Sequence, residues 1–232
     1  MADKIVVRNM LTAVAAVRHA VSSDETRPHL CCVSLDLSDR REPCVVATDG
    51  HRLAIYRLRD EDVETATPAP SAINLAPKLV KEMTAKFVIA ALKRYGSMLD
   101  EVTISADRVA VSPHPVWGVV GGEPSWRLRT VDAKFSSWRH FVPTRALEPE
   151  DRGPHTISVN PRYLLDAEEA HKLVARVQWA SRSKPSKKDK EPSKNKLSAF
   201  VTRVELGPDE FAAMLVRSDV AALTCVVMPR KF

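Results

Sequence analysis

The feature of this 232-residue sequence that most constrains its fold is a segment that occurs three times. In each copy a short apolar stretch with strand character runs directly into a helix. The copies are KIVVRNMLTAVAAVRHAV from residue 4, AINLAPKLVKEMTAKFVIAALKRYG from residue 72 and TISVNPRYLLDAEEAHKLVARV from residue 156. In the second copy the apolar spacing predicts one helix over residues 77–95. Pro77 and Pro161 fall in the expected first helical turn, where a missing N–H costs nothing.

Each predicted helix is followed by stretches rich in β-branched and alternating apolar residues, which predict strands. These stretches are LCCVSLDL and CVVATDGHRLAIYRL, then EVTISADRVAVSP and SWRLRTVD, and finally AFVTRVEL and AALTCVVMP. Each unit is therefore predicted to be β-α-β-β-β, an α+β fold with the helices on one face of antiparallel sheets. Asp49 and Gly50 predict a tight turn between two of the strands, with Gly50 at a positive φ.

Two such units side by side make a two-layer domain of ordinary size, so residues 1–145 are predicted to be one complete domain. Residues 146–155 are rich in proline and charge and predict a linker. Residues 156–232 then form a half-domain with exposed sheet edges, which we expect to pack against the first domain, another chain, or both. Its tract SRSKPSKKDKEPSKNK, residues 181–196, predicts a basic mobile loop that serves either solubility or contact with DNA phosphate.

Composition adds weaker constraints. Lys and Arg total 35 against 29 Asp and Glu, and this moderate excess favours polyanionic partners only slightly, since six of the lysines lie in the basic tract. No apolar run of 18 residues and no signal-peptide core is present, which predicts a cytoplasmic protein. The four cysteines, Cys31, Cys32, Cys44 and Cys225, lack C-x-x-C spacing, so we expect neither a metal site nor a disulfide, and no cofactor.

Five segments, in order along the chain, resemble a known family. They are SDETRP at residues 23–28, ATDGHRLA at 47–54, DAKFSSWRHFVP at 132–143, VNPRYLLDA at 159–167 and VVMPR at 226–230. Together they resemble the bacterial DNA polymerase III beta subunit, the sliding clamp. The resemblance covers the middle domain of a three-domain clamp and the second half of its last domain, so the chain resembles a shortened clamp.

The resemblance implies a noncatalytic processivity factor, a ring that encircles duplex DNA with its helices lining the hole. A moderately basic, mixed-charge surface suits sliding, because contacts to phosphates carry no sequence information. The residues expected to face DNA are Arg8 and Arg18 from the first helix, Lys78, Lys81, Lys93 and Arg94 from the second, and Arg162, Lys172 and Arg176 from the third. Spacing alone favours a solvated basic face for the same residues.

The resemblance also implies a hydrophobic pocket for short linear peptides of polymerases and repair proteins. Its residues would be Thr48, Gly50, His51, Arg52, Leu53, Pro143, Val226, Val227, Met228, Pro229 and Arg230. In this interpretation the valines and Leu53 bury apolar anchors, Met228 adapts to varied side chains, and Arg52 or His51 holds a peptide carbonyl or carboxylate. Without the resemblance, residues 226–229 are equally consistent with the end of a core strand.

The implied partners are double-stranded DNA, a DNA polymerase and other proteins with clamp-binding peptides, a clamp loader, and further copies of this chain. Clamp rings contain twelve half-domain units and this chain has three, so the unit count predicts a homotetramer, with a dimer or trimer left open. The alternative is a non-ring paralogue that acts as a decoy or regulator of clamp-client interactions. An enzyme using Asp49 and His51 as metal ligands, or a Cys and His pair, is disfavoured because no catalytic motif accompanies them.

Overall fold

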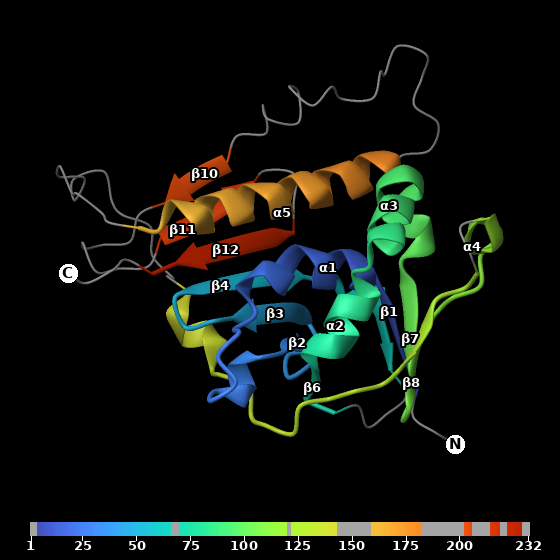
Figure 1. Ribbon diagram of the computed structural model, residues 1–232, viewed down its shortest axis with the longest axis horizontal. Coiled ribbons are helices and arrows are strands. Elements are labelled where there is room, and N and C mark those ends of the chain that lie inside the picture. The colour runs from blue at the N-terminus through green and yellow to red at the C-terminus, as the bar shows by residue number, and fades with distance from the viewer. Residues whose placement is uncertain are drawn as a thin grey trace, which may run out of the picture.

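The computed structural model describes residues 4–65, 70–119, 122–142, 159–181, 202–205, 214–218 and 222–228 (Figure 1). Its strands are β1 (Ile5–Arg8), β2 (Val33–Asp36), β3 (Cys44–Thr48), β4 (Arg52–Arg57), β5 (Val63–Thr65), β6 (Ala72–Leu75), β7 (Glu101–Ile104), β8 (Arg108–Val111), β9 (Ser125–Arg127), β10 (Thr202–Glu205), β11 (Met214–Ser218) and β12 (Leu223–Val227). Its α-helices are α1 (Met10–Val17), α2 (Pro77–Met83), α3 (Lys86–Tyr95), α4 (Pro115–Val119) and α5 (Pro161–Ala180). Its 3-10 turns are η1 (Arg18–Ala20), η2 (Pro28–Leu30), η3 (Asp60–Asp62), η4 (Gly96–Leu99) and η5 (Trp138–Phe141).

The strands form two antiparallel sheets, in the orders β5-β1-β7-β8-β9 and β10-β11-β12-β4-β3-β2-β6. We call β1 to β4 with α1 the first unit, β6 to β9 with α2 and α3 the second unit, and α5 with β10 to β12 the third unit. The first two units exchange their opening strands, since β1 pairs with β7 and β6 pairs with β2. The predicted α+β class, with antiparallel sheets built from repeated units, is confirmed.

The third unit extends the sheet of the first unit. Strand β12 pairs antiparallel with β4 over five residues, from Leu223 opposite Tyr56 to Val227 opposite Arg52. The third unit therefore packs against the first, which is one of the arrangements expected from its exposed sheet edges. The opening strand predicted near residues 156–160, the linker at 146–155 and the basic tract beyond residue 181 lie outside the described residues, apart from residues 159 and 160.

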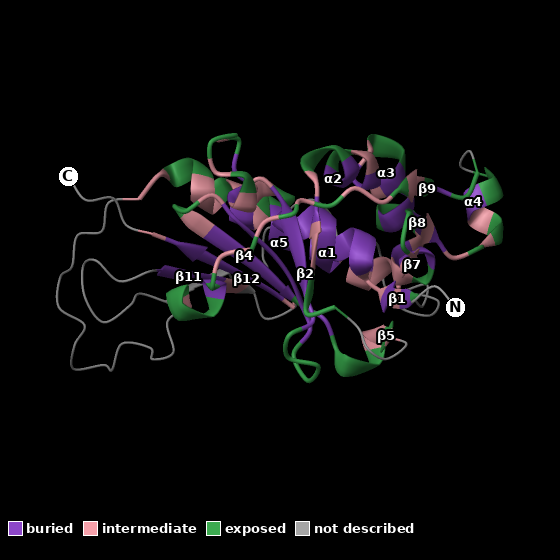
Figure 2. Ribbon diagram, turned by 90° about the horizontal axis from the view of Figure 1, so that it is seen from below, coloured by how far each residue is buried: buried purple, intermediate pink, exposed green. Residues whose placement is uncertain are grey.

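Helices α1, α2 and α5 lie on one face of the seven-stranded sheet, with α3 beside them (Figure 1). Helix α1 is the core of this layer: all eight of its residues are buried, because α5 and α2 flank it and β3 and β4 lie beneath it (Figure 2). Its sequence MLTAVAAV carries no charge, and burying each large apolar side chain contributes about 1.5–3 kcal/mol. The expectation that this helix carries Arg8 and Arg18 is wrong, because Arg8 lies in β1 and Arg18 in η1.

The continuous helix predicted over residues 77–95 is also wrong. Helix α2 ends before Thr84, whose hydroxyl donates to the Val80 carbonyl at 2.8 Å, and Ala85 adopts an extended ψ of 151° before α3 begins. Arg18 holds the break in place, since its Nη1 donates to the hydroxyl and the carbonyl of Thr84 at 2.8 and 3.3 Å. The break therefore depends on a residue of the first unit, which the local pattern does not contain.

Two strands were not predicted from the sequence. Strand β11 is buried at Met214, Leu215 and Val216, so both of its faces are covered and its pattern is continuous rather than alternating. Strand β5 has three residues and pairs only with the edge of β1. Among the helices that the structure describes, none has the length and apolar character needed to cross a membrane.

Candidate functional site

The turn between β3 and β4 is built by hydrogen bonds from its own side chains. Gly50 has a φ of 88°, which confirms the predicted tight turn. The Asp49 Oδ1 atom accepts from the backbone N–H groups of His51 and Arg52, at 2.9 and 3.0 Å. The Thr48 hydroxyl donates to the Arg52 carbonyl at 2.7 Å and accepts from the Gly50 N–H at 3.1 Å. Asp49 and Thr48 therefore shape the turn.

The end of β12 lies directly beside this turn. Val226 is opposite Leu53, and the Met228 N–H donates to the His51 carbonyl at 2.9 Å. The sheet thus brings together the two sequence-distant segments from which the peptide pocket was predicted. Three of the predicted pocket residues, Pro143, Pro229 and Arg230, lie outside the described residues.

These segments belong to an apolar cluster on the sheet face opposite the helices, because side chains alternate between faces along β3 and β4. We call it the outer cluster. Its buried members are Cys44, Val46, Leu53, Ile55, Trp138, Leu215 and Val226, and its partly buried members are Phe135, Val142 and Met228. Val227 belongs to the main core on the helix side instead. The accessible apolar surface here is therefore formed by the three partly buried members rather than by the valines of β12.

The segment containing η5 closes the outer cluster through Trp138. The Trp138 Nε1–H donates to Asp36 Oδ2 at 2.9 Å, and Arg139 donates to the same oxygen at 2.6 Å. The Arg139 guanidinium also stacks over the Trp138 ring, 4.5 Å from its centre. Sequence reasoning placed only Pro143 of this segment in the pocket, although the aromatic residues of the segment mark its contribution.

Arg52 joins the first unit to the third. Its Nε lies 3.0 Å from Asp49 Oδ2 and its Nη1 lies 2.5 Å from Asp166 Oδ2 of α5. Its guanidinium also lies 4.5 Å from the ring centre of Tyr163, another residue of α5. With two carboxylates and an aromatic ring around it, the Arg52 side chain is only 14% exposed. His51 is exposed, so it is the better placed of the two to meet a peptide.

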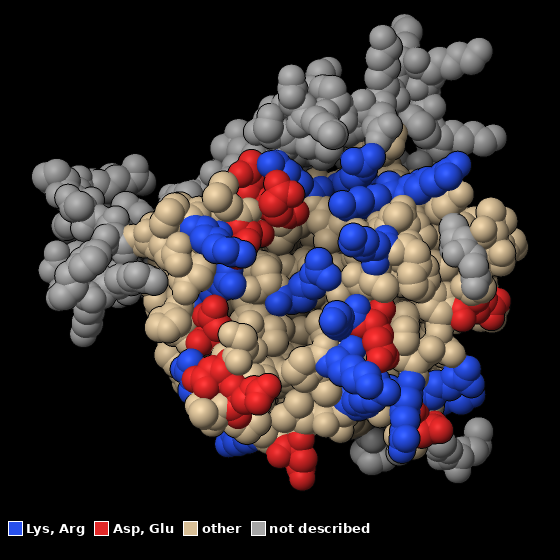
Figure 3. All heavy atoms as spheres, in the orientation of Figure 1, with Lys and Arg blue, Asp and Glu red and all other residues tan. Residues whose placement is uncertain are grey.

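The exposed basic residues are spread over the helix face. Figure 3 shows Lys and Arg side chains across this face, with Asp and Glu among them. Of the residues predicted to face DNA, the exposed ones are Arg18, Lys78, Lys81, Lys93, Arg94 and Arg162. The face therefore has a mixed-charge character, in which Lys and Arg gather in groups toward the right of the view and Asp and Glu lie mostly to the left.

The other predicted DNA-facing residues are less available. Lys172 lies 2.9 Å from Glu168 and 3.1 Å from Glu169, and Arg176 is half-buried in α5. Arg8 lies in β1, where it is 2.5 Å from Glu64 and 3.1 Å from Glu101. Neighbouring carboxylates balance the charges of Arg8 and Lys172. The six exposed residues are therefore the stronger candidates for contact with phosphates.

The buried titratable groups have structural roles. Asp100 accepts from the N–H groups of Leu11 and Thr12 at 2.6 and 2.9 Å, which caps the start of α1, and its burial raises its pKa to about 6. Burial, with Arg52 nearby, lowers the pKa of His19 to about 4. Burial likewise raises the pKa of Cys44 to about 11, which keeps this thiol protonated at neutral pH.

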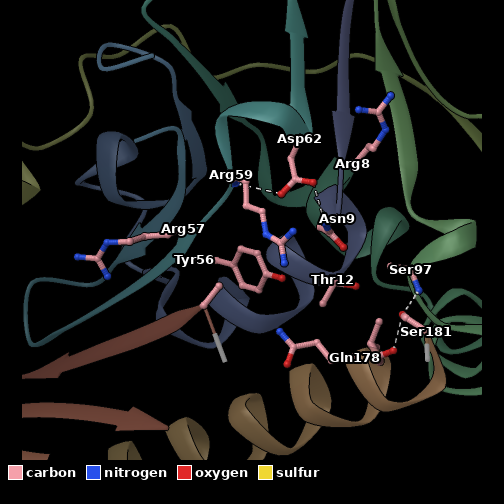
Figure 4. Close-up of a pocket in the computed structure, with 12 residues that line it drawn as sticks. Arg8, Asn9, Thr12, Tyr56, Arg57, Arg59, Asp62, Ser97, Gln178 and Ser181 are labelled. Atoms are coloured by element: carbon pink, nitrogen blue, oxygen red, sulfur yellow. Dashed lines mark hydrogen bonds between the residues drawn. The ribbon is translucent and has the colours of Figure 1, made fainter. Parts of the chain in front are cut away.

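A polar hollow of about 640 Å³ lies where β1, β4 and η3 meet the end of α5 (Figure 4). Some of its polar groups are bonded to one another: the Asn9 amide donates to Asp62 at 3.1 Å, and the Ser97 N–H donates to the Ser181 hydroxyl at 2.7 Å. It lies on a different side of β4 from the outer cluster and includes none of the predicted pocket residues. In the part of the chain that the structure describes, no group of three His, Cys, Asp or Glu side chains is placed to hold a metal ion.

No protein-family model matches the sequence, and a search of the curated proteins finds no match. The solved structures give a clear result. A sliding clamp from Bartonella birtlesii bound to griselimycin has a TM-score of 0.60 at 15% identity, and the alignment covers 99% of this chain and 66% of the clamp. The beta subunit from Thermotoga maritima has a TM-score of 0.55 at 18% identity, covering 99% of this chain and 65% of that one.

A third similar structure, the sliding clamp from Bacillus subtilis, has a TM-score of 0.55 at 17% identity and is covered over 64% of its length. The chain thus spans about two thirds of the length of the clamps it matches. Each match extends over almost the whole of this chain, so the three units are arranged as in a clamp. The protein has the fold of the bacterial DNA polymerase III beta subunit, the sliding clamp, in a shortened form.

Proposed function

We propose that this protein is a noncatalytic, clamp-like processivity factor that encircles duplex DNA as an oligomeric ring and tethers polymerase or repair proteins. The observation that carries the proposal is the joint between β4 and β12. It brings the β3–β4 turn and the end of β12 together on one face of the sheet, while the basic helices lie on the other. A ring of such units would turn one face toward DNA and the other toward its partners.

The helix face supports contact with the DNA backbone. Its exposed cations share the face with carboxylates, which limits the net positive charge and favours contacts to phosphates that can be exchanged as the protein moves. A strongly basic helix face would instead slow sliding by holding the backbone in place. This mixed surface favours a topological hold on DNA over tight binding.

The outer cluster supports a site for an extended peptide with apolar anchors. Met228, Val142 and Phe135 offer partly open apolar surface, and Met228 can change its shape to fit different side chains. His51, exposed beside Met228, can bond a peptide carbonyl or carboxylate. The proposed partners are therefore the polymerases and repair proteins that carry clamp-binding peptides.

A ring requires further copies of the chain. The three units per chain and the twelve units of clamp rings make a homotetramer the proposed assembly. A closed ring has no free end for DNA to enter, so a clamp loader is a further proposed partner. Because the proposed ligand is DNA, the cytoplasm is the proposed location.

The outer cluster favours a second candidate function. It is formed within a single chain, so peptide binding needs no ring, and this would suit a clamp paralogue that forms none. Such a protein would bind clamp clients, or a full-length clamp, as a decoy or regulator. It would retain the outer cluster but would not be held on DNA.

Peptide binding is the test shared by both candidates, and the probe is a fluorescent peptide carrying the clamp-binding segment of a bacterial DNA polymerase. We expect Met228→Asp to weaken binding at least tenfold, because it places a charge among apolar anchors. The control is Phe87→Asp, at an exposed apolar residue of α3 outside the outer cluster, which should leave binding unchanged. Equal binding by the wild type and Met228→Asp would refute the peptide site.

A further inference from the structure

The second unit repeats the connections of the first. After β4, the chain of the first unit continues into β5, which pairs with the free edge of β1. After β9, the chain of the second unit continues into residues 129–131, where Thr130 bridges to Leu75 of β6 and the Val131 N–H donates to the Asn74 carbonyl at 2.8 Å. Strand β9 is therefore the counterpart of β4, and each is the last strand of its unit.

The chain also contains an example of how two units join. Strand β12, the last strand of the third unit, pairs antiparallel with β4, the last strand of the first. The joint between units is thus made by two last strands, edge to edge. Strand β4 lies between β3 and β12, and β12 lies between β11 and β4, so both edges of each strand are paired. Among the last strands of the described units, only β9 has an edge without a neighbour.

The hydrogen bonds of β9 show which of its backbone groups face outward. The Val111 N–H donates to the Pro124 carbonyl at 3.0 Å, the Leu128 N–H donates to the Asp107 carbonyl at 2.7 Å, and Trp126 lies opposite Val109. Alternation in an antiparallel pair then directs the backbone N–H and C=O groups of the two remaining residues away from β8. These residues are Ser125 and Arg127, and both are exposed.

The position of β9 in the molecule suits an interface. In Figure 2 it lies toward the end of the molecule opposite β11 and β12 of the third unit, with α4 farther out at the same end. Trp126 is partly buried against the main core and lies at the middle of the strand. A neighbouring strand at this edge would cover the open side of its ring as well as the backbone groups.

We propose that β9 pairs antiparallel with β9 of a second copy of this chain, about a twofold axis near Trp126. A second copy is the favoured occupant for two reasons. In that copy β4 and β12 are already paired on both edges, which leaves β9 as its available last strand, and an antiparallel pair of identical strands is self-complementary. The role of this pair rests on the proposed function, because the pair would form one of the interfaces that close a ring. A three-residue strand offers few hydrogen bonds, so the pair should dissociate on dilution unless a second interface supports it.

The test is the mass of the full chain by analytical ultracentrifugation over a concentration series, for the wild type and three variants. Arg127→Pro and Ser125→Pro each remove one outward N–H and leave the backbone bonds to β8 intact, which an edge position tolerates, although Ser125→Pro also removes the bond from Arg108 to the Ser125 hydroxyl. Arg127→Ala is the control, because it removes the side chain and keeps the N–H. We expect wild type and Arg127→Ala to assemble alike, and both proline variants to show half the wild-type mass while melting cooperatively.

The outcomes separate this inference from the proposed function. A wild type that stays monomeric at high concentration overturns the β9 pair and the ring together. Proline variants with the full wild-type mass overturn the β9 pair alone, and a ring closed through other edges would stand. If the proline variants halve the mass but the wild type is not retained on circular DNA, the β9 pair is supported and the ring function fails.

Discussion

Asp100 is a buried carboxyl group, and its burial disfavours the charged form. It caps α1, yet its surroundings raise its pKa to about 6, above the value near 4 of an unfolded chain. A raised pKa means that the folded state holds the proton more tightly than the unfolded state. The stabilising contribution is therefore complete below about pH 4 and is lost as pH rises through 6.

The first prediction concerns this residue. In Asp100→Asn the carboxyl proton no longer titrates, so the difference in unfolding free energy between variant and wild type should change by on the order of 3 kcal/mol between pH 4 and pH 7. The change should favour the variant as pH rises. Urea denaturation at several pH values measures it, with Asp107→Asn at an exposed site as the control. A constant difference across this range would show that Asp100 does not titrate on folding.

Arg52 provides the second prediction at this scale. Replacing it with Ala removes two ion pairs and the stack on Tyr163, and leaves Asp166 half-buried without its cation. We expect a loss of about 1.5–3 kcal/mol in unfolding free energy, the usual range for hydrogen bonds to charged groups. Hydrogen exchange should show the loss concentrated in α5, since the contact joins α5 to the first unit. The exposed Arg40 changed to Ala is the control, and a uniform loss across all elements would contradict a role at the joint.

At the scale of the elements, the prediction concerns the helices that carry basic residues. Lys78 and Lys81 of α2 are exposed, whereas Lys172 of α5 is balanced by two glutamates. Each lysine that contacts a phosphate contributes about 0.9 to the slope of log affinity against log salt. Replacing Lys78 and Lys81 together with Ala should reduce that slope by about 2, measured by fluorescence anisotropy on duplex DNA.

The matched control is Lys172→Ala, whose effect on the slope should be close to zero. If the double variant and the control change the slope equally, the helix face does not track DNA through α2. The measurement tests the helix face alone, because neither lysine contributes to the outer cluster.

Sequence patterns predicted the elements whose causes are local. The β3–β4 turn was predicted because Asp49 and Gly50 set it themselves, and α5 because Pro161 and the apolar spacing mark it. The division between α2 and α3 was not predicted, because it depends on Arg18 of another unit. Strand β11 was missed because burial on both faces removes the alternation on which strand prediction depends.

The candidate site was predicted in the same uneven way. The segments around Leu53 and Val226 were expected together and do lie together. The ion pair of Arg52 with Asp166 was not predicted, because Asp166 lies in a helix that is distant in the sequence and a sequence does not give the direction of a side chain. Val227 was placed in the pocket, but its register on β12 turns it toward the main core.

At the scale of the whole molecule, the described residues form an arc of three units, and among them β9 and β10 are edge strands at its two ends. Strand β9 ends one sheet, and β10 ends the other at the third unit. In the described part of the chain, the first and second units are joined by the β1–β7 and β2–β6 pairs, and the first and third units are joined by the β4–β12 pair. Whether the arc closes on further copies decides between a ring and a decoy, because peptide binding is common to both.

The most direct measurement is retention of the protein on nicked circular DNA, loaded with a bacterial clamp loader and ATP and then passed through gel filtration at high salt. A ring is predicted to stay with the circle at a salt concentration that removes ordinary DNA binding, and to be released when the same DNA is cut once to a linear form. Equal release from circular and linear DNA would contradict encirclement.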